Sequence, residues 1–427
     1  MTTFGASEVF HLLLALLVLL AATRLGGRLA IRAKLPPVIG ELSAGLVVGP
    51  SIFGALFPEA QVQVFPDAGV VAASLDAFYE LGLILLMFAA GVELRVAPRG
   101  DEARTAGIIT AAATAIPLAA GVAASLIFDL DPLEWTANDH AALVIVFAAA
   151  LAVTSIPVIS RIMLDLGLFG TRFSRIVLGA AVVEDILLYG LLAVAVGLAQ
   201  SGAQAFGLPA ELGIDAASAG GAAYYAAMTV VVLIVPLAAV RAANGSNRFD
   251  WILRRLGNEA QNQLLLLLAL TAACGALGVI PIFGALTAGL IVSQLHEVRV
   301  SSSSVGRFSL AFFIPIYFGL VGLRIDLQED ADLLLLASFI PVACLIKGAA
   351  VYLGARVARE APASARALAV ALNARGGPGI VLASVSFAAG IVSEEFFVTL
   401  IMLSLVTSAI AGWWLQRLLA NRDEALS

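Results

Sequence analysis

The sequence has few charged residues, few histidines and almost no cysteine. Only 13% of its 427 residues are charged, and it contains three histidines and two cysteines. So little charge excludes an ordinary soluble domain, in which about a quarter of the residues are charged. Two cysteines exclude a disulfide framework and a cysteine-rich metal cluster. No pairing of a nucleophile with its base is evident either. We therefore expect no enzyme, no cofactor and no nucleic-acid partner.

Long apolar runs make up most of the chain instead. Hydrophobic residues account for 61% of it, and the mean hydropathy is +1.01. Runs of roughly 17 to 25 apolar residues are long enough to cross a bilayer as helices. Thirteen such spans are predicted, at 8–31, 36–57, 72–95, 104–128, 140–165, 174–199, 221–241, 260–278, 280–296, 308–325, 333–357, 366–391 and 395–418. The predicted fold is an all-α polytopic membrane protein, with residues 1–427 forming one membrane domain.

The distribution of charge predicts the orientation of these spans. All but three of the 24 basic residues lie in or beside the connections after odd-numbered spans, and the exceptions are Arg324, Lys347 and Arg375. The connections after even-numbered spans collect acidic residues instead. Positive residues favour the cytoplasmic side of a membrane. We therefore expect an N-terminus outside, a cytoplasmic C-terminus and a location in a bacterial inner membrane.

Two adjacent carboxylates, Glu184 and Asp185, interrupt the apolar run VLGAAVVEDILLYG at 177–190. If this helix enters the membrane near Arg175, Asp185 lies ten residues inside, or about 15 Å, which is half of a ~30 Å hydrocarbon core. A carboxylate at that depth costs at least ~2.5 kcal/mol and usually faces a partner or a wet cavity. The pair therefore indicates an ion or proton site. A purely structural role, in which the pair only holds two helices together, is the alternative.

Two other spans contain residues that break helices. The fifth span carries TSIP at 154–157, and the twelfth carries RGGPG at 375–379. Proline removes a helical hydrogen bond and glycine weakens a helix, so each span should open there and expose main-chain carbonyls. The two breaks are seven spans apart. Spans 1–6 and 8–13 would then form two inverted six-helix repeats with two broken crossing helices, an arrangement that indicates a transporter site at mid-membrane.

Lys347 lies nine residues before Arg356, or about 13 Å, and therefore also near mid-membrane. Neighbouring residues on a helix point about 100° apart, so one of Glu184 and Asp185 should face Lys347 and the other the crossing, and spacing does not decide which. A hard monovalent cation prefers oxygen ligands. We expect it at Asp185, with the hydroxyl groups of Thr154 and Ser155 as further ligands or as supports of the crossing.

Other candidates have two alternative roles each. Arg375 either pairs with a carboxylate or neutralises helix C-termini. Glu41 has either a structural or a gating role, and gating or structural roles are also expected of Pro157, Gly376 and Pro378. The three histidines lie near span ends and are not expected to be ligands.

Several segments resemble the bacterial monovalent cation:proton antiporters of the second cation/proton antiporter group. These segments are LPPVIGELSAGLVVGP at 35–50, ELGLILLMFAAGVEL at 80–94, TSIPVISRIMLDLGL at 154–168, VLGAAVVEDILLYG at 177–190, FGALTAGLIVS at 283–293, FFIPIYFGLVGLRIDL at 312–327 and ARGGPGIVLA at 374–383. The resemblance implies a homodimer in a lipid bilayer, with a mobile core that moves as an elevator. It also implies a dimerisation part at 1–100 and 255–326, an ion-translocating core at 104–199 and 333–418, and a linker at 200–254.

The resemblance further implies that Asp185 binds the cation or the proton. The position before it is Asp, Asn or Gln in the family, and here it is Glu184. An acidic residue there together with Lys347 resembles the electrogenic sodium/proton branch. We therefore expect exchange of Na⁺ for protons by alternating access, serving pH homeostasis. A K⁺/H⁺ antiporter of the potassium-efflux branch and a secondary transporter of organic anions remain alternatives.

Overall fold

The computed structural model is helical in nearly all of the residues that it describes. These are residues 5–33, 35–93, 101–137, 139–155, 171–199, 207–214, 259–279, 281–295, 304–328 and 331–420, with single positions between 159 and 238. Within these ranges the only β-structure is an isolated bridge between Glu134 and Val392. The prediction of an all-α fold is therefore confirmed.

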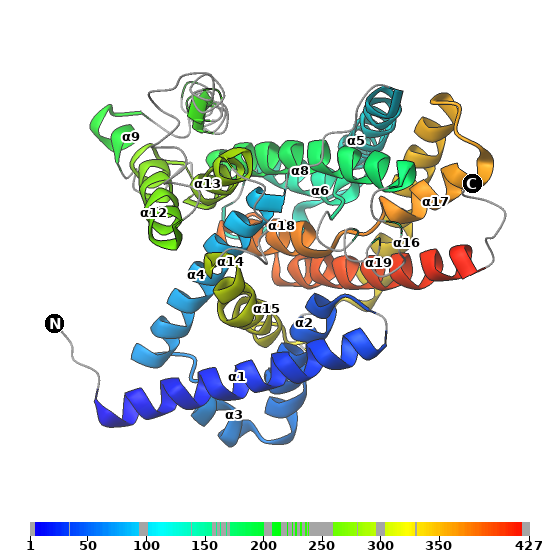
Figure 1. Cartoon of the computed structure of the whole chain (residues 1–427). Helices are drawn as coiled ribbons and strands as arrows, with labels where there is room; N and C mark the ends of the chain where they lie inside the picture. The colour runs from blue at the N-terminus through cyan, green and yellow to red at the C-terminus, as the bar shows by residue number, and fades with distance from the viewer. Residues whose placement is uncertain are drawn as a thin grey trace. The chain divides into compact units, whose positions relative to one another are not determined.

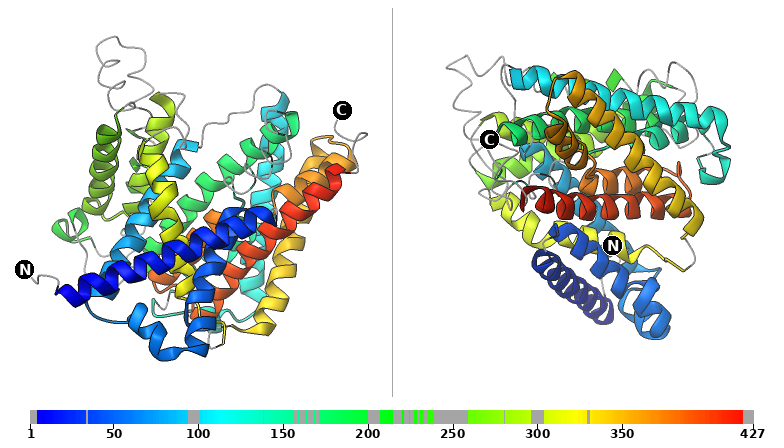
Figure 2. Two further views of the ribbon diagram at one scale, coloured as in Figure 1. Left: turned by 60° about the horizontal axis from the view of Figure 1, so that its bottom comes forward. Right: turned by 90° about the vertical axis from the view of Figure 1, so that its right-hand side faces the viewer.

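The helices, which are labelled in Figure 1, fall into two compact units. Unit 1 comprises Met1–Arg95, Val231–Gly275 and Ile280–Asp330. Its helices are α1 (Ala6–Arg32), α2 (Pro37–Val48), η1 (Pro50–Gly54), α3 (Pro58–Val64), α4 (Val70–Glu93), α12 (Ala260–Ala276), α13 (Pro281–Leu295), α14 (Ser304–Phe308), η4 (Ser309–Phe313) and α15 (Ile314–Leu323). Helix α1 packs along α2, and α4 packs against α13 (Figure 2). Gly26 and Gly40 allow the first contact, since a Cβ on either would collide with the other's carbonyl.

Unit 2 comprises Val96–Val230, Ala276–Val279 and Ala331–Ser427. Its helices are α5 (Asp101–Ile127), η2 (Asp131–Leu133), α6 (His140–Ala152), α8 (Arg172–Ala199), α9 (Leu208–Glu211), α16 (Leu333–Val357), α17 (Pro362–Ala371), α18 (Gly376–Ala388) and α19 (Glu394–Ala420). Helix α5 packs against α6, α8 and α16, while α18 lies beside α19. The predicted roles of dimerisation part and translocating core stay predictions, and most of the predicted linker at 200–254 lies outside the described residues.

The described residues contain eight helices that are long and apolar enough to cross a membrane, or nine if the bent pair α17 and α18 counts as one span. Three shorter apolar helices, α6, α12 and α13, cover further predicted spans. The seventh predicted span and the second half of the fifth lie largely outside the described residues. The count of thirteen therefore stays a prediction.

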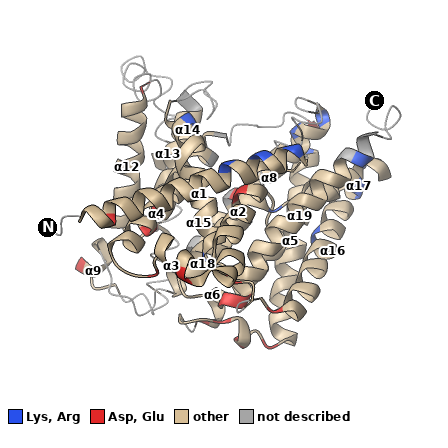
Figure 3. Cartoon of the chain, turned by 90° about the horizontal axis from the view of Figure 1, so that it is seen from below, with Lys and Arg blue, Asp and Glu red and all other residues tan. Residues whose placement is uncertain are grey.

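Acidic residues begin two of the apolar helices of unit 2. The Asp139 carboxylate accepts a hydrogen bond from the Ala142 amide at the start of α6, and the Asp332 carboxylate accepts two from amides at the start of α16. Both are N-caps, which satisfy amides that have no partner within the helix. Helix α16 ends with Arg356 in its last turn. Figure 3 shows red segments around the start of α6 and blue segments near the C-terminus.

Two ion pairs join helix ends within unit 2. The Arg175 guanidinium, at the start of α8, donates two hydrogen bonds to the Glu102 carboxylate of α5, at 2.6 and 2.7 Å. Arg172 pairs with Glu360, between α16 and α17, at 2.7 Å. Bidentate arginine–carboxylate pairs are geometrically specific. These contacts hold the beginning of α8 against both neighbours.

The break in the twelfth predicted span lies just before the glycine-rich segment and not within it. Helix α17 ends at Ala371, α18 begins at Gly376, and the two are bent by 40°. Gly376 has a φ of 37°, which favours glycine, and its amide donates to the Ser408 hydroxyl. Pro378 lies in the first turn of α18, where proline interrupts no intrahelical hydrogen bond. These residues start the second half-helix, so the predicted position of the opening was wrong by a few residues.

Candidate functional site

The two interrupted helices meet inside unit 2. Helix α6 ends at Ala152, and the extended residues that follow reach the segment between α17 and α18. The Thr154 hydroxyl donates to the Leu372 carbonyl at 2.6 Å, and the Ser155 amide donates to the Ala374 carbonyl at 2.7 Å. Thr154 and Ser155 are both fully buried. Each break therefore supplies hydrogen-bond partners that the other needs in an apolar environment.

Arg375 joins this crossing through main-chain carbonyls. Its side chain is fully buried, and its guanidinium donates to the carbonyls of Ala150, Leu151 and Ala343 at 3.0 to 3.2 Å. It also donates to the Asn373 side chain at 2.6 Å. The last carbonyls of a helix lack partners within it and carry partial negative charge. Arg375 thus caps the C-terminus of α6, which is the second of the two roles expected for it.

Removing this cap should destabilise the crossing. We expect Arg375→Ala to lower the free energy of unfolding by about 3 kcal/mol or more, because it leaves several buried carbonyls without a donor and each costs ~1–3 kcal/mol. Thermal unfolding of the purified protein in detergent would measure the loss. Arg366→Ala is the matched control, since that exposed side chain bonds, among the described residues, to a carbonyl of its own helix. Equal melting temperatures for the two variants would show that the cap is dispensable.

A buried ion pair shows which residue the first carboxylate of α8, that of Glu184, contacts. The Lys347 ammonium, on α16, lies 2.9 Å from the Glu184 carboxylate, and the two side chains are 0% and 2% exposed. The same ammonium donates to the carbonyls of Ala113, at 3.0 Å, and Ala152, at 2.5 Å. Its three donors are therefore all used. Glu184 faces Lys347, which spacing along the helix left undecided.

Asp185 is the second buried carboxylate, and it is only 2% exposed. Its Oδ1 atom has no hydrogen-bond partner within the described part of the chain. A buried carboxylate oxygen without a donor is costly unless a proton or a cation occupies it. Lys347 is bonded to Glu184, and among the residues that the structure describes no cationic group is bonded to Asp185. The site therefore suits a single positively charged guest.

Four other predicted residues stand apart from these contacts. Glu41 belongs to α2 in unit 1, where its carboxylate lies over Gly27 of α1, and its gating or structural role stays a prediction. Pro157 lies outside the described residues. Gly376 and Pro378 begin α18, as described above. The cation-ligand roles of Thr154, Ser155 and Asp185 also stay predictions.

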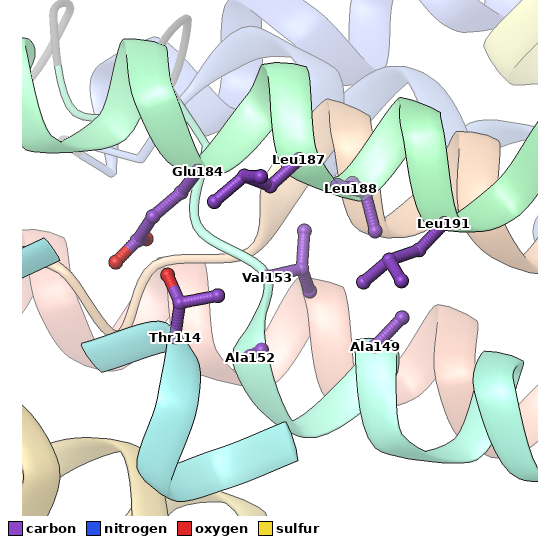
Figure 4. A pocket seen from close by; sticks show the side chains of 8 residues that line it. All are labelled: Thr114, Ala149, Ala152, Val153, Glu184, Leu187, Leu188 and Leu191. Atoms are coloured by element: carbon purple, nitrogen blue, oxygen red, sulfur yellow. The ribbon is translucent and has the colours of Figure 1, made fainter. Parts of the chain in front are cut away.

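Two polar residues near the site were not predicted. Asn373 bridges the crossing, since its side chain donates to the Cys344 carbonyl and accepts from Arg375. Thr114, on α5, lines a small pocket together with Glu184 (Figure 4). Single threonines and asparagines are ordinary in membrane helices, where they bond to nearby carbonyls. No sequence signal separated these two from the others.

One further cluster lies at the opposite end of α6. The ligand atoms of Asp131, Glu134 and His140 lie within 4.8 Å of one another, a spacing that could hold a metal ion. Burial, and then the nearby Asp131 carboxylate, raise the pKa of Glu134. The side chains of His140 and Asp131 are 54% and 75% exposed, and exposed acidic groups of this kind are common without an ion. The cluster is about 20 Å from the crossing along α6 and does not contribute to it.

Known proteins match almost the whole chain. A family model described as sodium/hydrogen exchanger, transmembrane, matches residues 12–421. The chain is 28% identical to the Na(+)/H(+) antiporter NhaS4 of Synechocystis, over 93% of this chain and 94% of that protein. It is 22% identical to the Na(+)/H(+)-K(+) antiporter GerN of Bacillus cereus, over 98% of each. The solved structure of the sodium proton antiporter MjNhaP1 from Methanocaldococcus jannaschii is similar in fold, with a TM-score of 0.58, 17% identity and coverage of 96% and 98%.

Proposed function

Because the chain belongs to the family of transmembrane sodium/hydrogen exchangers, we propose that it exchanges sodium ions for protons across a cell membrane. The family match confirms the resemblance seen in the sequence. Exchangers are transporters, and this agrees with a sequence in which no catalytic motif was evident.

Asp185 supports this proposal most directly. Within the described residues, its buried carboxylate has an oxygen without a hydrogen-bond partner, beside a Glu184 that pairs with Lys347. A sodium ion and a proton both satisfy such an oxygen, and each excludes the other. One site that binds either ion and opens alternately to the two sides of a membrane is sufficient for exchange. Thr154, Ser155 and the carbonyls of the crossing would complete the oxygen ligands of the cation.

The charge of the site disfavours an organic anion. Lys347 pairs with Glu184, and the Arg375 guanidinium is bonded to main-chain carbonyls and to Asn373, so the group that would face an anion is the Asp185 carboxylate, which repels it. A potassium/proton exchanger remains the second candidate. One relative, the K(+)/H(+) antiporter 1 of Saccharomyces cerevisiae, is 27% identical over 88% of this chain, which spans 42% of that protein. Transport measurements with Na⁺ and K⁺ therefore have to decide which ion is exchanged.

We further propose that unit 2, which carries Asp185, is the part that moves the ion, and that unit 1 forms a homodimer interface. The protein would lie in a bacterial inner membrane with its N-terminus outside. These assignments rest on the family resemblance and on the distribution of basic residues.

Proton movement in proteoliposomes tests the exchange directly. With an imposed pH gradient and a fluorescent pH indicator, adding Na⁺ to the wild type should dissipate the gradient, because the cation displaces protons from Asp185. Li⁺ should act similarly, and K⁺ should have little effect. A response to K⁺ alone would identify the potassium branch. No response to any of the three ions from folded, reconstituted protein would contradict the proposal.

A further inference from the structure

The first turn of α18 lies against a row of hydroxyl groups on α19, the helix beside it (Figure 1). The row consists of Ser404, Thr407 and Ser408, which are all buried. Residues three and four apart lie on the same face of a helix, so these three hydroxyls point in similar directions. Buried hydroxyls that face the end of another helix are available as hydrogen-bond partners for its main chain.

Helix α18 has no N-cap side chain of its own. Arg375, the residue before the helix, makes no side-chain hydrogen bond to the first turn. The first amides of a helix have no partner within it, and a serine, threonine, aspartate or asparagine before the helix usually binds one of them. Here the Gly376 amide donates to the Ser408 hydroxyl at 3.0 Å, and the Arg375 amide donates to the Thr407 hydroxyl at 3.3 Å. The neighbouring helix therefore caps α18.

Ser408 differs from the other hydroxyl residues of α19. The Thr399, Ser404 and Thr407 hydroxyls each donate to a carbonyl one turn earlier in their own helix. This is the usual behaviour of serine and threonine inside a helix. Within the described part of the chain, the Ser408 hydroxyl has its hydrogen bond with the Gly376 amide instead. The Ser408 side chain is therefore directed at α18.

We propose that Ser408, assisted by Thr407, is a positioning residue for the transported cation, because it fixes the segment 372–376 to which cation ligands are attached. Carbonyls of that segment accept hydrogen bonds from the Thr154 hydroxyl and the Ser155 amide. A chain of hydrogen bonds thus runs from α19 through the segment to Thr154 and Ser155, the proposed cation ligands. This inference rests on the proposed exchange of cations for protons, and it adds a residue that controls the affinity of the site without touching the ion.

Loss of this cap should change the affinity for the cation and not the maximal rate. Without the Ser408 oxygen, the buried Gly376 amide has no partner, so the segment 372–376 also adopts positions in which the ligand oxygens do not converge. The apparent affinity then falls by the fraction of molecules in which the site is competent to bind. A saturating cation concentration restores the competent arrangement, because binding favours it. Exchange at saturation should therefore remain close to that of the wild type.

The Na⁺ dependence of exchange in proteoliposomes separates positioning from a structural role. Ser408→Ala should raise the Na⁺ concentration for half-maximal exchange by roughly 3- to 10-fold, the factor by which one neutral hydrogen bond shifts an equilibrium. Thr407→Val should raise it too, and Thr407→Ser, which keeps the hydroxyl, should retain the wild-type value. Ser386→Ala is the matched control, because the Ser386 hydroxyl bonds to carbonyls of its own helix, α18.

Two results would overturn the proposal. One is a half-saturating Na⁺ concentration for Ser408→Ala equal to that of the wild type. The other is a lower maximal rate at an unchanged half-saturating concentration, because a loss of folded protein reduces the number of working sites without changing their affinity.

Amide hydrogen exchange, followed by mass spectrometry, tests the cap without any transport. We expect peptides that cover 372–379 to exchange at least about 3-fold faster in Ser408→Ala than in the wild type, while peptides from the start of α16 keep the wild-type rate. Equal rates for 372–379 in the two proteins would overturn the inference. Absence of cation-coupled transport in the wild type would instead contradict the proposed function, and the hydrogen-exchange rates would still decide whether Ser408 caps α18.

Discussion

Replacing Asp185 with asparagine should abolish cation-coupled proton movement. The amide has nearly the same shape, but it neither releases a proton at physiological pH nor supplies the negative charge that a cation needs. Because Lys347 already pairs with Glu184, we expect no second carboxylate among the described residues of the crossing to take over the full role. We expect exchange at or near the background of empty liposomes, a loss of at least about 100-fold if the charge contributes the ~3 kcal/mol typical of a buried ionic contact.

The matched control is Asp332→Asn, which makes the same chemical change at a position where we expect no effect on exchange. The Asp332 side chain caps the start of α16, and asparagine caps helices as well as aspartate does. Asp332→Asn should therefore fold and exchange ions like the wild type. Exchange by Asp185→Asn at the wild-type rate would remove Asp185 from the mechanism and move the search to Glu184.

Removing the ammonium of Lys347 should destabilise the protein strongly. Lys347→Met is nearly isosteric, but it leaves the Glu184 carboxylate buried without its counter-ion and leaves the carbonyls of Ala113 and Ala152 without a donor. Breaking a buried pair by removing one partner typically costs ~3–5 kcal/mol. Thermal unfolding of the purified variant in detergent should show a loss of this size.

A double variant distinguishes a lost pair from a lost side chain. Glu184→Gln added to Lys347→Met removes the stranded charge, so it should recover part of the lost stability, and the two changes should couple by about 0.5–3 kcal/mol. Glu184→Gln alone should be destabilising as well, since it leaves the ammonium uncompensated. Strictly additive losses would show that the contact between Lys347 and Glu184 contributes nothing beyond its separate parts.

The sequence predicts a depth for the site, and that depth stays a prediction, but the pairings of its residues could not be predicted from the sequence. Hydropathy and helical rise placed Asp185 and Lys347 near mid-membrane, because both depend only on counting residues along a helix. Which of the two carboxylates faces Lys347 depends on how α8 is rotated about its axis relative to α16. Residue spacing within one helix gives no information about that rotation. The partners of Arg375 could not be predicted either, because they are main-chain carbonyls of another helix. Every residue type carries such a carbonyl, so the sequence does not mark them.

The helix breaks illustrate the same limit at the level of the backbone. The sequence indicated that both spans are interrupted, but glycine and proline do not specify on which side the chain opens. In the twelfth predicted span the opening is at 372–375, because Gly376 and Pro378 suit the first turn of α18. Thr114 was missed for a different reason. Its hydroxyl lies beside Glu184 and has no hydrogen bond within the described part of the chain, which only the packing of α5 against α6 and α8 reveals.

The crossing also constrains the order in which the protein can be completed during synthesis. The Thr154 hydroxyl and the last carbonyls of α6 find their partners in residues 372–375, more than 200 positions later in the chain. Until the ribosome has made that segment, the first half carries main-chain groups that lipid cannot satisfy. The first half of the chain is therefore incomplete as a membrane structure until the second half has been made, and the crossing forms only when both halves are present.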